Sequence, residues 1–303
     1  MIDVGCAKGE LSLKMICHYF SYKYNFKKEH PHFFKPDGTI VFVGEQGSGK
    51  SLFAYEYVDQ LMKKYPLCKM VTNLDLRDYP VTTFDSFISQ HDEYYKFLDL
   101  YDIYKYWNKK DIKGLLSAYD TQVFSLFYNR YMNEIRVFPF YNNDDLRRYK
   151  NGEYGIIFFI DEIALYMNNL ESKNLNMAVM GQLAQQRKQR LHIVATTQRI
   201  GRTVKQLREQ YPCIMRCNNV FGSESILGFL NRNELLKNAD IGDDGHVEGD
   251  VYRKFWSIHN VANYGAYDTY AILEKGQFCS GEKSLDLLFN SVLDEVKLGG
   301  KVC

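Results

Sequence analysis

The sequence lacks the features that would place a protein in a membrane, outside the cell or on a zinc ion. No stretch approaches ~18 uninterrupted apolar residues, so we expect no transmembrane helix. The start has no charged segment followed by an apolar run and a small-residue cleavage site, which predicts a cytoplasmic, non-secreted protein. The seven cysteines are an odd number without a CxxC pair, which favours reduced thiols over zinc ligands or disulfides.

Net charge is nearly absent as well. The 38 basic and 37 acidic residues leave a formal charge of +1, so the chain as a whole is not a polycation. Any contact with nucleic acid must therefore come from a local basic patch. The 303 residues, 46% of them hydrophobic, are enough for one large α/β domain with insertions or for two small domains.

Five short apolar segments have the pattern of buried parallel strands, at residues 39–43, 69–73, 155–160, 191–197 and 213–217. Residues 51–65 and 177–190 have helical spacing, and the first helix lies between two of the strands. That order predicts a right-handed βαβ unit. The sequence therefore predicts an α/β fold with a mainly parallel sheet.

The predicted core is interrupted and extended. Residues 80–150 are rich in Tyr, Phe, Asp and Lys with mostly helical periodicity, which indicates a helical insertion. The expected divisions are an N-terminal extension at 1–38, the main domain at 39–275 and a C-terminal tail at 276–303. Beyond Asn218 the signals weaken, and residues 251–258 and 266–273 are expected to add edge strands or a hairpin.

Residues 44–51 read GEQGSGKS and match the phosphate-loop (P-loop) pattern GxxxxGK[ST]. Glycines let the backbone curl so that its N–H groups point at phosphate oxygens, and the following helix adds its positive end. Lys50 is expected to reach the β- and γ-phosphates, and Ser51 to bind Mg²⁺. A chance match is the alternative, but the required strand and helix flank the motif. The predicted ATP-binding residues are Gly44, Glu45, Gln46, Gly47, Ser48, Gly49, Lys50, Ser51 and Leu52.

Three polar residues follow apolar strands downstream of this loop. Asp161 and Glu162 come after IIFFI, and the carboxyl edge of a parallel sheet is where ligands bind. We predict that Asp161 holds Mg²⁺ and that Glu162 is the general base; helix capping is the alternative. Gln198 ends VATTQ and is predicted to contact the γ-phosphate or orient the water, the alternative being a turn residue.

The tetrapeptide NKKD at residues 108–111 matches the guanine-specificity pattern NKxD. It precedes the predicted Mg²⁺ carboxylate, whereas a guanine-reading loop should follow it. It also lies in a polar helical stretch. We therefore predict adenine as the base.

Three further segments resemble a known family. They are the arginine-rich block at 181–218, TNLDL at 72–76 and YDTY at 267–270. Together with the P-loop they resemble the zonula occludens toxin-like ATPases of the FtsK–HerA class, the DNA-pumping or virion-assembly motors of viruses, filamentous phages and mobile elements. The resemblance covers residues 39–220, with a weaker match near residue 267. It implies a P-loop NTPase three-layer sandwich of the RecA or FtsK–HerA kind, found in the host cytoplasm or a virion.

The resemblance also implies roles for single residues. Lys50 and Ser51 match the family's phosphate-loop residues, Asp161 and Glu162 its metal-binding and base acids, and Gln198 its sensor glutamine. Family members form ring hexamers in which a neighbouring subunit often supplies an arginine. The first candidates are Arg208 and then Arg187; the alternative for each is a solvated helix face or a salt bridge.

The chain departs from filamentous-phage members, which carry a transmembrane segment after the ATPase domain. Its absence favours a packaging or transfer motor over a membrane channel. The basic residues between 187 and 208 would line a ring's pore and contact a DNA backbone, or else serve subunit contacts and solubility. Aromatic residues at 94–107 would stack on single-stranded bases, or else form the core of the insertion.

The first functional hypothesis is therefore an ATP-hydrolysing motor that packages or transfers DNA, with capsid or assembly proteins as further partners. One rival is a small-molecule P-loop kinase, against which a hydrolytic base at Glu162 argues, since it would waste ATP. The other is a P-loop ATPase, or an ATP-gated scaffold, that acts in virion assembly or secretion without pumping DNA.

Overall fold

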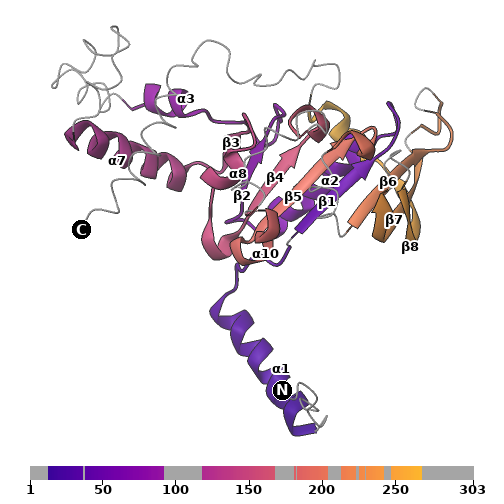
Figure 1. The fold of residues 1–303 in the computed structure, drawn as a ribbon, viewed down its shortest axis with the longest axis horizontal. Coiled ribbons are helices and arrows are strands. Elements are labelled where there is room, and N and C mark those ends of the chain that lie inside the picture. The colour runs from indigo at the N-terminus through magenta and orange to yellow at the C-terminus, as the bar shows by residue number, and fades with distance from the viewer. Residues whose placement is uncertain are drawn as a thin grey trace, which may run out of the picture.

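The computed structural model describes residues 13–36, 38–91, 118–167, 181, 183–203, 213–222, 225–228, 230–241 and 247–267. An eight-stranded sheet runs through this part of the chain in the order β3-β2-β4-β5-β1-β6-β7-β8 (Figure 1). The first six strands in that order pair in parallel, and β7 and β8 are antiparallel. The predicted α/β fold with a mainly parallel sheet is confirmed.

All five predicted strands are present in the parallel part of the sheet. They are β1 (Gly38–Val43), β2 (Lys69–Thr72), β4 (Ile156–Ile160), β5 (Leu191–Thr197) and β6 (Cys213–Asn219). Every residue of β4 and β5 is buried, as expected for central strands covered on both faces. Strand β2 follows β1 and its helix in the chain, but β4 and β5 lie between the two strands in the sheet.

Helix α2 (Lys50–Lys64) covers one face of the sheet, and its buried side chains include Tyr55 and Val58. These pack with Phe42 of β1, whereas the adjacent Val41 belongs to a second core cluster on the opposite face. Helix α7 (Ala118–Glu134) contributes Phe127 to that second cluster. Helices on both faces of the sheet make the predicted three-layer sandwich.

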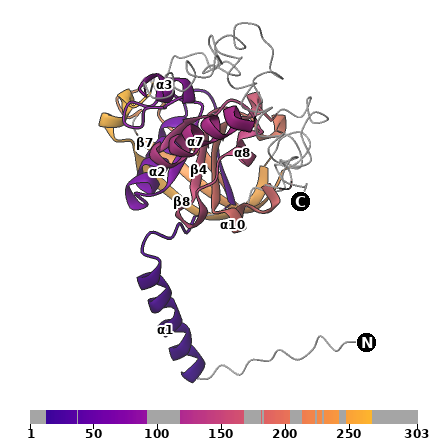
Figure 2. The same cartoon turned by 90° about the vertical axis from the view of Figure 1, so that its left-hand side faces the viewer.

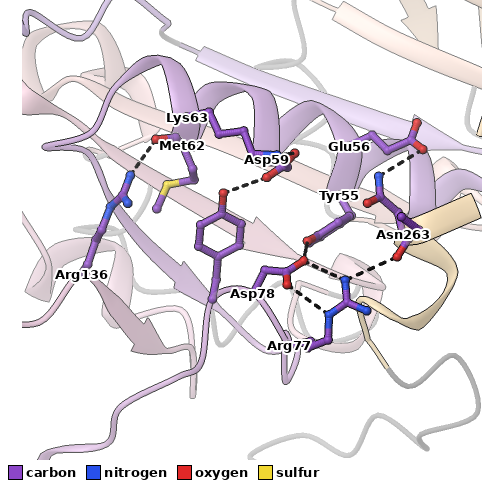
Figure 3. Close-up of polar contacts among 11 residues, drawn as sticks. Tyr55, Glu56, Asp59, Met62, Lys63, Arg77, Asp78, Arg136 and Asn263 are labelled. Atoms are coloured by element: carbon purple, nitrogen blue, oxygen red, sulfur yellow. Dashed lines mark hydrogen bonds and ion pairs between the residues drawn. The ribbon is translucent and has the colours of Figure 1, made fainter. Parts of the chain in front are cut away.

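Polar contacts hold α2 to the segments around it (Figure 3). Arg136 donates from Nη2 to the carbonyl oxygen of Met62 at 2.7 Å, near the end of α2, where a positive charge also complements the helix dipole. The hydroxyl of Tyr79 donates to Asp59 at 2.8 Å on the same helix. The helix that starts at the P-loop is therefore anchored along its length.

The segment predicted as a helical insertion contains helices and one strand of the main sheet. Helices α3 (Phe84–Ser89), α7 and α8 (Asp145–Arg148) lie in its described part. Strand β3 (Val137–Pro139) pairs with β2 at the edge of the sheet, so this part of the segment belongs to the core. The motif at 108–111 and the aromatic residues at 94–107 lie outside the described residues.

The end of the sheet is an antiparallel hairpin of β7 (Leu230–Ile241) and β8 (Val247–Ile258). The sequence predicts edge strands or a hairpin at residues 251–258 and 266–273; the first of these segments lies in β8, which pairs with β7. In the second segment, Ala266 is buried and follows a short 3₁₀ helix, Val261–Gly265. Tyr267 forms an isolated bridge with Leu76. Residues 268–303, including the predicted tail, lie outside the described residues.

The N-terminal segment forms α1 (Leu13–Glu29), which extends away from the sheet (Figures 1 and 2). The chain then reaches the body at Phe34, which is fully buried and whose N–H donates to the carbonyl of Glu153 at 2.9 Å. Gly155 has φ 71°, and a Cβ there would overlap the ring of Phe34. No helix in the described ranges is long and apolar enough to cross a bilayer.

Candidate nucleotide-binding site

The P-loop joins the end of β1 to the start of α2. Gly47 and Gly49 have φ of 77° and 76°, in the left-handed region that glycine tolerates best. The turn is closed by Ser48 N–H donating to the carbonyl of Glu45 at 3.1 Å, and α2 begins with Phe53 N–H donating to the carbonyl of Gly49 at 2.9 Å. The predicted loop and helix start are therefore both present, with backbone N–H groups gathered at a helix N-terminus.

Gly44 is required by a close approach between the loop and strand β6. A Cβ at this position would lie 2.6 Å from the carbonyl oxygen of Cys217 and would overlap the hydroxyl of Ser48. The first glycine of the motif therefore has a packing role, whereas Gly47 and Gly49 have a conformational one.

The two predicted acids lie at the carboxyl end of β4, and Asn73 at the end of the neighbouring strand β2 holds the backbone of the first of them, Asp161. Its amide donates to the carbonyl of Asp161 at 2.8 Å, and its Oδ1 accepts from the N–H of Asp161 at 2.8 Å. Asn73 is buried, so these bonds are shielded from water. The side-chain amide acts as an extra rung between two strand ends.

Thr196 of β5 positions both acids from the other side. Its hydroxyl donates to Oδ1 of Asp161 at 2.6 Å and accepts from the N–H of Glu162 at 2.9 Å. Thr196 is fully buried, and the two bonds use its single donor and one acceptor site. The direction of the Asp161 carboxylate is therefore set by a neighbouring strand.

Glu162 combines backbone strain with an unusual electrostatic environment. Its φ of 49° and ψ of 60° lie in the left-handed region, which costs about 1–3 kcal/mol for a residue with a side chain. Burial raises the pKa of its carboxyl above the ordinary value, and Asp161 adds to the rise. The charge of Lys50 and a hydrogen bond from the backbone of Gln198 act in the opposite direction on this pKa. A carboxylate with raised proton affinity beside the P-loop lysine suits a general base.

The remaining predicted residues are placed unequally. Gln198 follows β5, and its backbone forms a hydrogen bond with Glu162. Its side chain is exposed, and its role as a sensor of the γ-phosphate stays a prediction. Arg187 lies in α10 (Gln186–Gln189), just before β5 begins. It is therefore at the amino end of the parallel strands, whereas the P-loop follows the carboxyl end of β1. Within one chain the fold does not bring Arg187 to this site. Arg208 lies outside the described residues.

Three residues of the site were not assigned roles from the sequence, namely Asn73, Thr196 and Tyr267. The side chain of Tyr267 is hydrogen-bonded to Ser51, and burial raises its pKa, with the nearby charge of Asp161 adding to the rise. The signal was available, because each residue belongs to one of the motifs TNLDL, VATTQ and YDTY. Polar residues that end neighbouring parallel strands meet at one edge of the sheet.

Comparisons with known proteins give structural similarities only. No protein-family model and no curated protein matches the chain. Its structure is similar to the genome-packaging NTPase B204 of Sulfolobus turreted icosahedral virus 2 in complex with ATP-gammaS. Sequence identity is 12%, the TM-score is 0.40, and the match covers 71% of this chain and 96% of that one.

Two other solved structures are similar at the same level. The N-terminal domain of zonular occludens toxin from Neisseria meningitidis has 14% identity and a TM-score of 0.37, covering 76% of this chain and 98% of that one. The DNA-packaging ATPase B204 of Sulfolobus turreted icosahedral virus has 14% identity and a TM-score of 0.38, covering 74% and 98%. The fold assignment itself rests on this chain's own strand order and on the loop that follows β1.

Proposed function

We propose that this chain is an ATPase that binds Mg-ATP on its P-loop and activates water with Glu162. The main support is the convergence of three strand ends, which puts Asp161 and Glu162 on one hydroxyl of Thr196. The charge of Lys50, which lowers the pKa of the Glu162 carboxyl, further supports a base close to the P-loop. A structural ion pair alone would not need the strained backbone of Glu162.

The residues present fit a hard divalent cation. Ser51 offers a hydroxyl and Asp161 a carboxylate, the oxygen ligands that Mg²⁺ prefers alongside phosphate oxygens. When bound, the cation would neutralise charge on the phosphates. Lys50 would bind the β- and γ-phosphates, Glu162 would accept the proton of the attacking water, and Gln198 would orient that water.

We further propose that hydrolysis drives the packaging or transfer of DNA by a ring of identical subunits in a host cell or virion. Support comes from the sequence resemblance and from exposed basic residues around β5: Arg187, Lys188, Arg199 and Arg202. Arg187 lies at the amino end of the parallel strands, away from the P-loop of its own chain, which suits a residue that acts on a neighbouring subunit's site. The neighbouring Arg190 is not counted with them, because its guanidinium stacks on the ring of Phe33, 4.1 Å from the ring centre.

The test is ATP hydrolysis by the purified protein with no DNA, with single-stranded DNA and with double-stranded DNA. Lys50→Ala is the control, because it removes the phosphate-binding charge at an incompletely buried position. We expect hydrolysis to require Lys50 and to rise severalfold with the preferred DNA. Lys50-dependent hydrolysis that ignores both DNAs in an oligomeric protein would favour the assembly ATPase over the motor. Phosphate transfer to a small molecule would favour the kinase.

A further inference from the structure

A buried polar cluster lies behind the P-loop, on the side formed by the β7–β8 hairpin. Asn231, near the start of β7, is 0% exposed, and His259, directly after β8, is 3% exposed. A Cβ on Gly49 would lie 2.6 Å from Nδ2 of Asn231 and 2.6 Å from Nε2 of His259. The hairpin therefore packs directly against the last glycine of the P-loop motif.

The hydrogen bonds in this cluster run in one direction. Nδ2 of Asn231 donates to the carbonyl oxygen of Ser48 at 2.8 Å and lies 2.8 Å from Nε2 of His259. Because the amide has two N–H groups and one goes to Ser48, the other goes to His259. This pattern assigns Nε2 as the acceptor and places the imidazole proton on Nδ1.

The same cluster continues into helix α2. Nδ1 of His259 lies 3.6 Å from Oε2 of Glu56, so the assigned proton faces a carboxylate. Oε1 of Glu56 accepts from the N–H of Asn260 at 2.8 Å. It also accepts from the side-chain amide of Asn263 at 3.5 Å (Figure 3). Glu56 thus holds the segment that carries His259. His259 in turn favours the one orientation of the Asn231 amide in which both of its N–H groups are hydrogen-bonded.

The bond to Ser48 has a consequence on the other side of the same peptide. In a trans peptide the carbonyl of one residue and the N–H of the next point in opposite directions. Holding the Ser48 carbonyl toward Asn231 therefore turns the Gly49 N–H away from the hairpin. An N–H turned in this direction would be available to phosphate oxygens, which the backbone N–H groups of a P-loop bind.

We propose that Asn231 is a positioning residue for nucleotide binding, with His259 and Glu56 holding its amide in place. Its action is to orient the Gly49 N–H through the Ser48 carbonyl, without touching the nucleotide. This inference rests on the proposed nucleotide binding at the P-loop. The antiparallel hairpin, which lies outside the P-loop motif, would then contribute to the phosphate site.

The experiment compares Asn231→Leu with Asn233→Leu. Asn233 is the matched control, because it lies two residues along β7, is also 0% exposed, and donates to Ser257 at 2.7 Å instead of to the P-loop. Each variant is measured for thermal unfolding without nucleotide and for equilibrium binding of a fluorescent ATP analogue with Mg²⁺. We expect similar losses of melting temperature, but an affinity reduced about tenfold or more only for Asn231→Leu, since a bond to a charged phosphate is weakened.

A second pair keeps the test decisive if Asn231→Leu does not fold. His259→Gln retains an acceptor for the Asn231 amide and His259→Phe does not, so affinity should be closer to wild type in the first. Equal affinity losses in the Asn231 and Asn233 variants, or no loss in either, would overturn the inference. If Asn231→Leu keeps wild-type, Lys50-dependent binding, the inference fails but the proposed function stands. If the wild-type protein binds no nucleotide, the proposed function fails as well.

Discussion

The parallel strands and the β7–β8 hairpin meet the same P-loop, yet they are built differently. Strands β4 and β5 are buried at every residue, and their polar side chains, His192, Thr196 and Thr197, lie near the two ends of β5. The hairpin has exposed large side chains, such as Trp256 at 53% and Ile258 at 69%, and buries two asparagines as well as Leu236. The parallel part gains its stability from apolar burial, while the hairpin contributes directed hydrogen bonds.

Charge is also handled differently in the two regions. In the hairpin, Glu234 pairs with Lys254 at 3.0 Å and with Arg216 at 3.3 Å across neighbouring strands. The hydrogen bond from Lys254 is the main cause that lowers the pKa of Glu234 below its ordinary value. In the parallel part, burial raises the pKa of Glu162 instead. The comparison teaches that the same residue type stabilises one region and costs stability in the other.

The largest difference should appear when one apolar side chain is removed from each region. Phe158→Ala in β4 empties a fully buried site and should lower the free energy of unfolding by about 3–5 kcal/mol. Ile258→Ala in β8 should change it by less than about 0.5 kcal/mol, because that side chain is 69% exposed. Urea unfolding curves measure both values. Similar losses for the two variants would remove the distinction between the regions.

Glu162→Gln should separate stability from activity. Loss of the base should slow ATP hydrolysis by at least about 100-fold. Because the folded-state pKa of Glu162 is raised, the folded protein binds this proton more tightly, and wild-type stability falls as the pH rises from the ordinary glutamate pKa through the folded one. The variant should lack that fall and be the more stable protein at neutral pH.

Thermal unfolding of wild type and Glu162→Gln from pH 4 to pH 8 checks this sign. Lys50→Gln serves as a comparison, since it removes a charge that lowers the pKa of the Glu162 carboxyl and should steepen the fall. A Glu162→Gln protein less stable than wild type at neutral pH would contradict the stated effect of burial.

Thr196→Val should have an intermediate effect. It leaves Oδ1 of Asp161 and the N–H of Glu162 without their shared hydroxyl, which should cost about 1–3 kcal/mol of stability and slow hydrolysis. Thr197→Val is the control on the next residue, because its hydroxyl makes only long contacts of 3.4 Å, one to Oε1 of Glu162 and one to the carbonyl of Arg199. Chemical unfolding and steady-state hydrolysis are the measurements. A control with the larger effect would show that the hydroxyl of Thr196 does not organise the acids.

The smallest effect is expected from Glu234→Gln on the hairpin. Glu234 is half-buried, but its partners Lys254 and Arg216 are exposed, and pairs open to solvent contribute about 0–1 kcal/mol that salt weakens. Because the folded-state pKa of Glu234 is lowered, its contribution is present above the ordinary glutamate pKa and lost as the pH falls through the folded one. Unfolding curves at low and high salt test this, and a loss well above 1 kcal/mol would place Glu234 among the buried, structurally required charges.

Much of the phosphate site could be predicted from the sequence because its signals are local. The loop at 44–51 contains its own glycines, lysine and hydroxyl in one run, and the apolar strands before it and before Asp161 are recognisable alone. The helix after the loop was equally clear, since its buried residues recur at helical spacing. Each of these features depends on neighbours a few residues away.

The hairpin was the hardest part to predict because its pattern depends on distant partners. Strand β7 reads LNRNELLKNADI, in which Asn231 and Asn233 occupy buried positions that an alternating pattern would make apolar. Strand β3 is only three residues long and exists because β2 lies beside it. Short or polar strands give little signal until the sheet supplies their hydrogen bonds and their cover.

The sequence by itself determined the chemistry at the P-loop, namely the glycines, Lys50, Ser51 and the acids that follow β4. Only the tertiary structure decided what orients them. It aligned the ends of β2, β4 and β5 so that Asn73 and Thr196 hold Asp161, and it folded a distant hairpin so that Asn231 meets Ser48. The physical reason is that a reactive group is defined by residue type, whereas a hydrogen bond is defined by two atoms that folding must bring within about 3 Å.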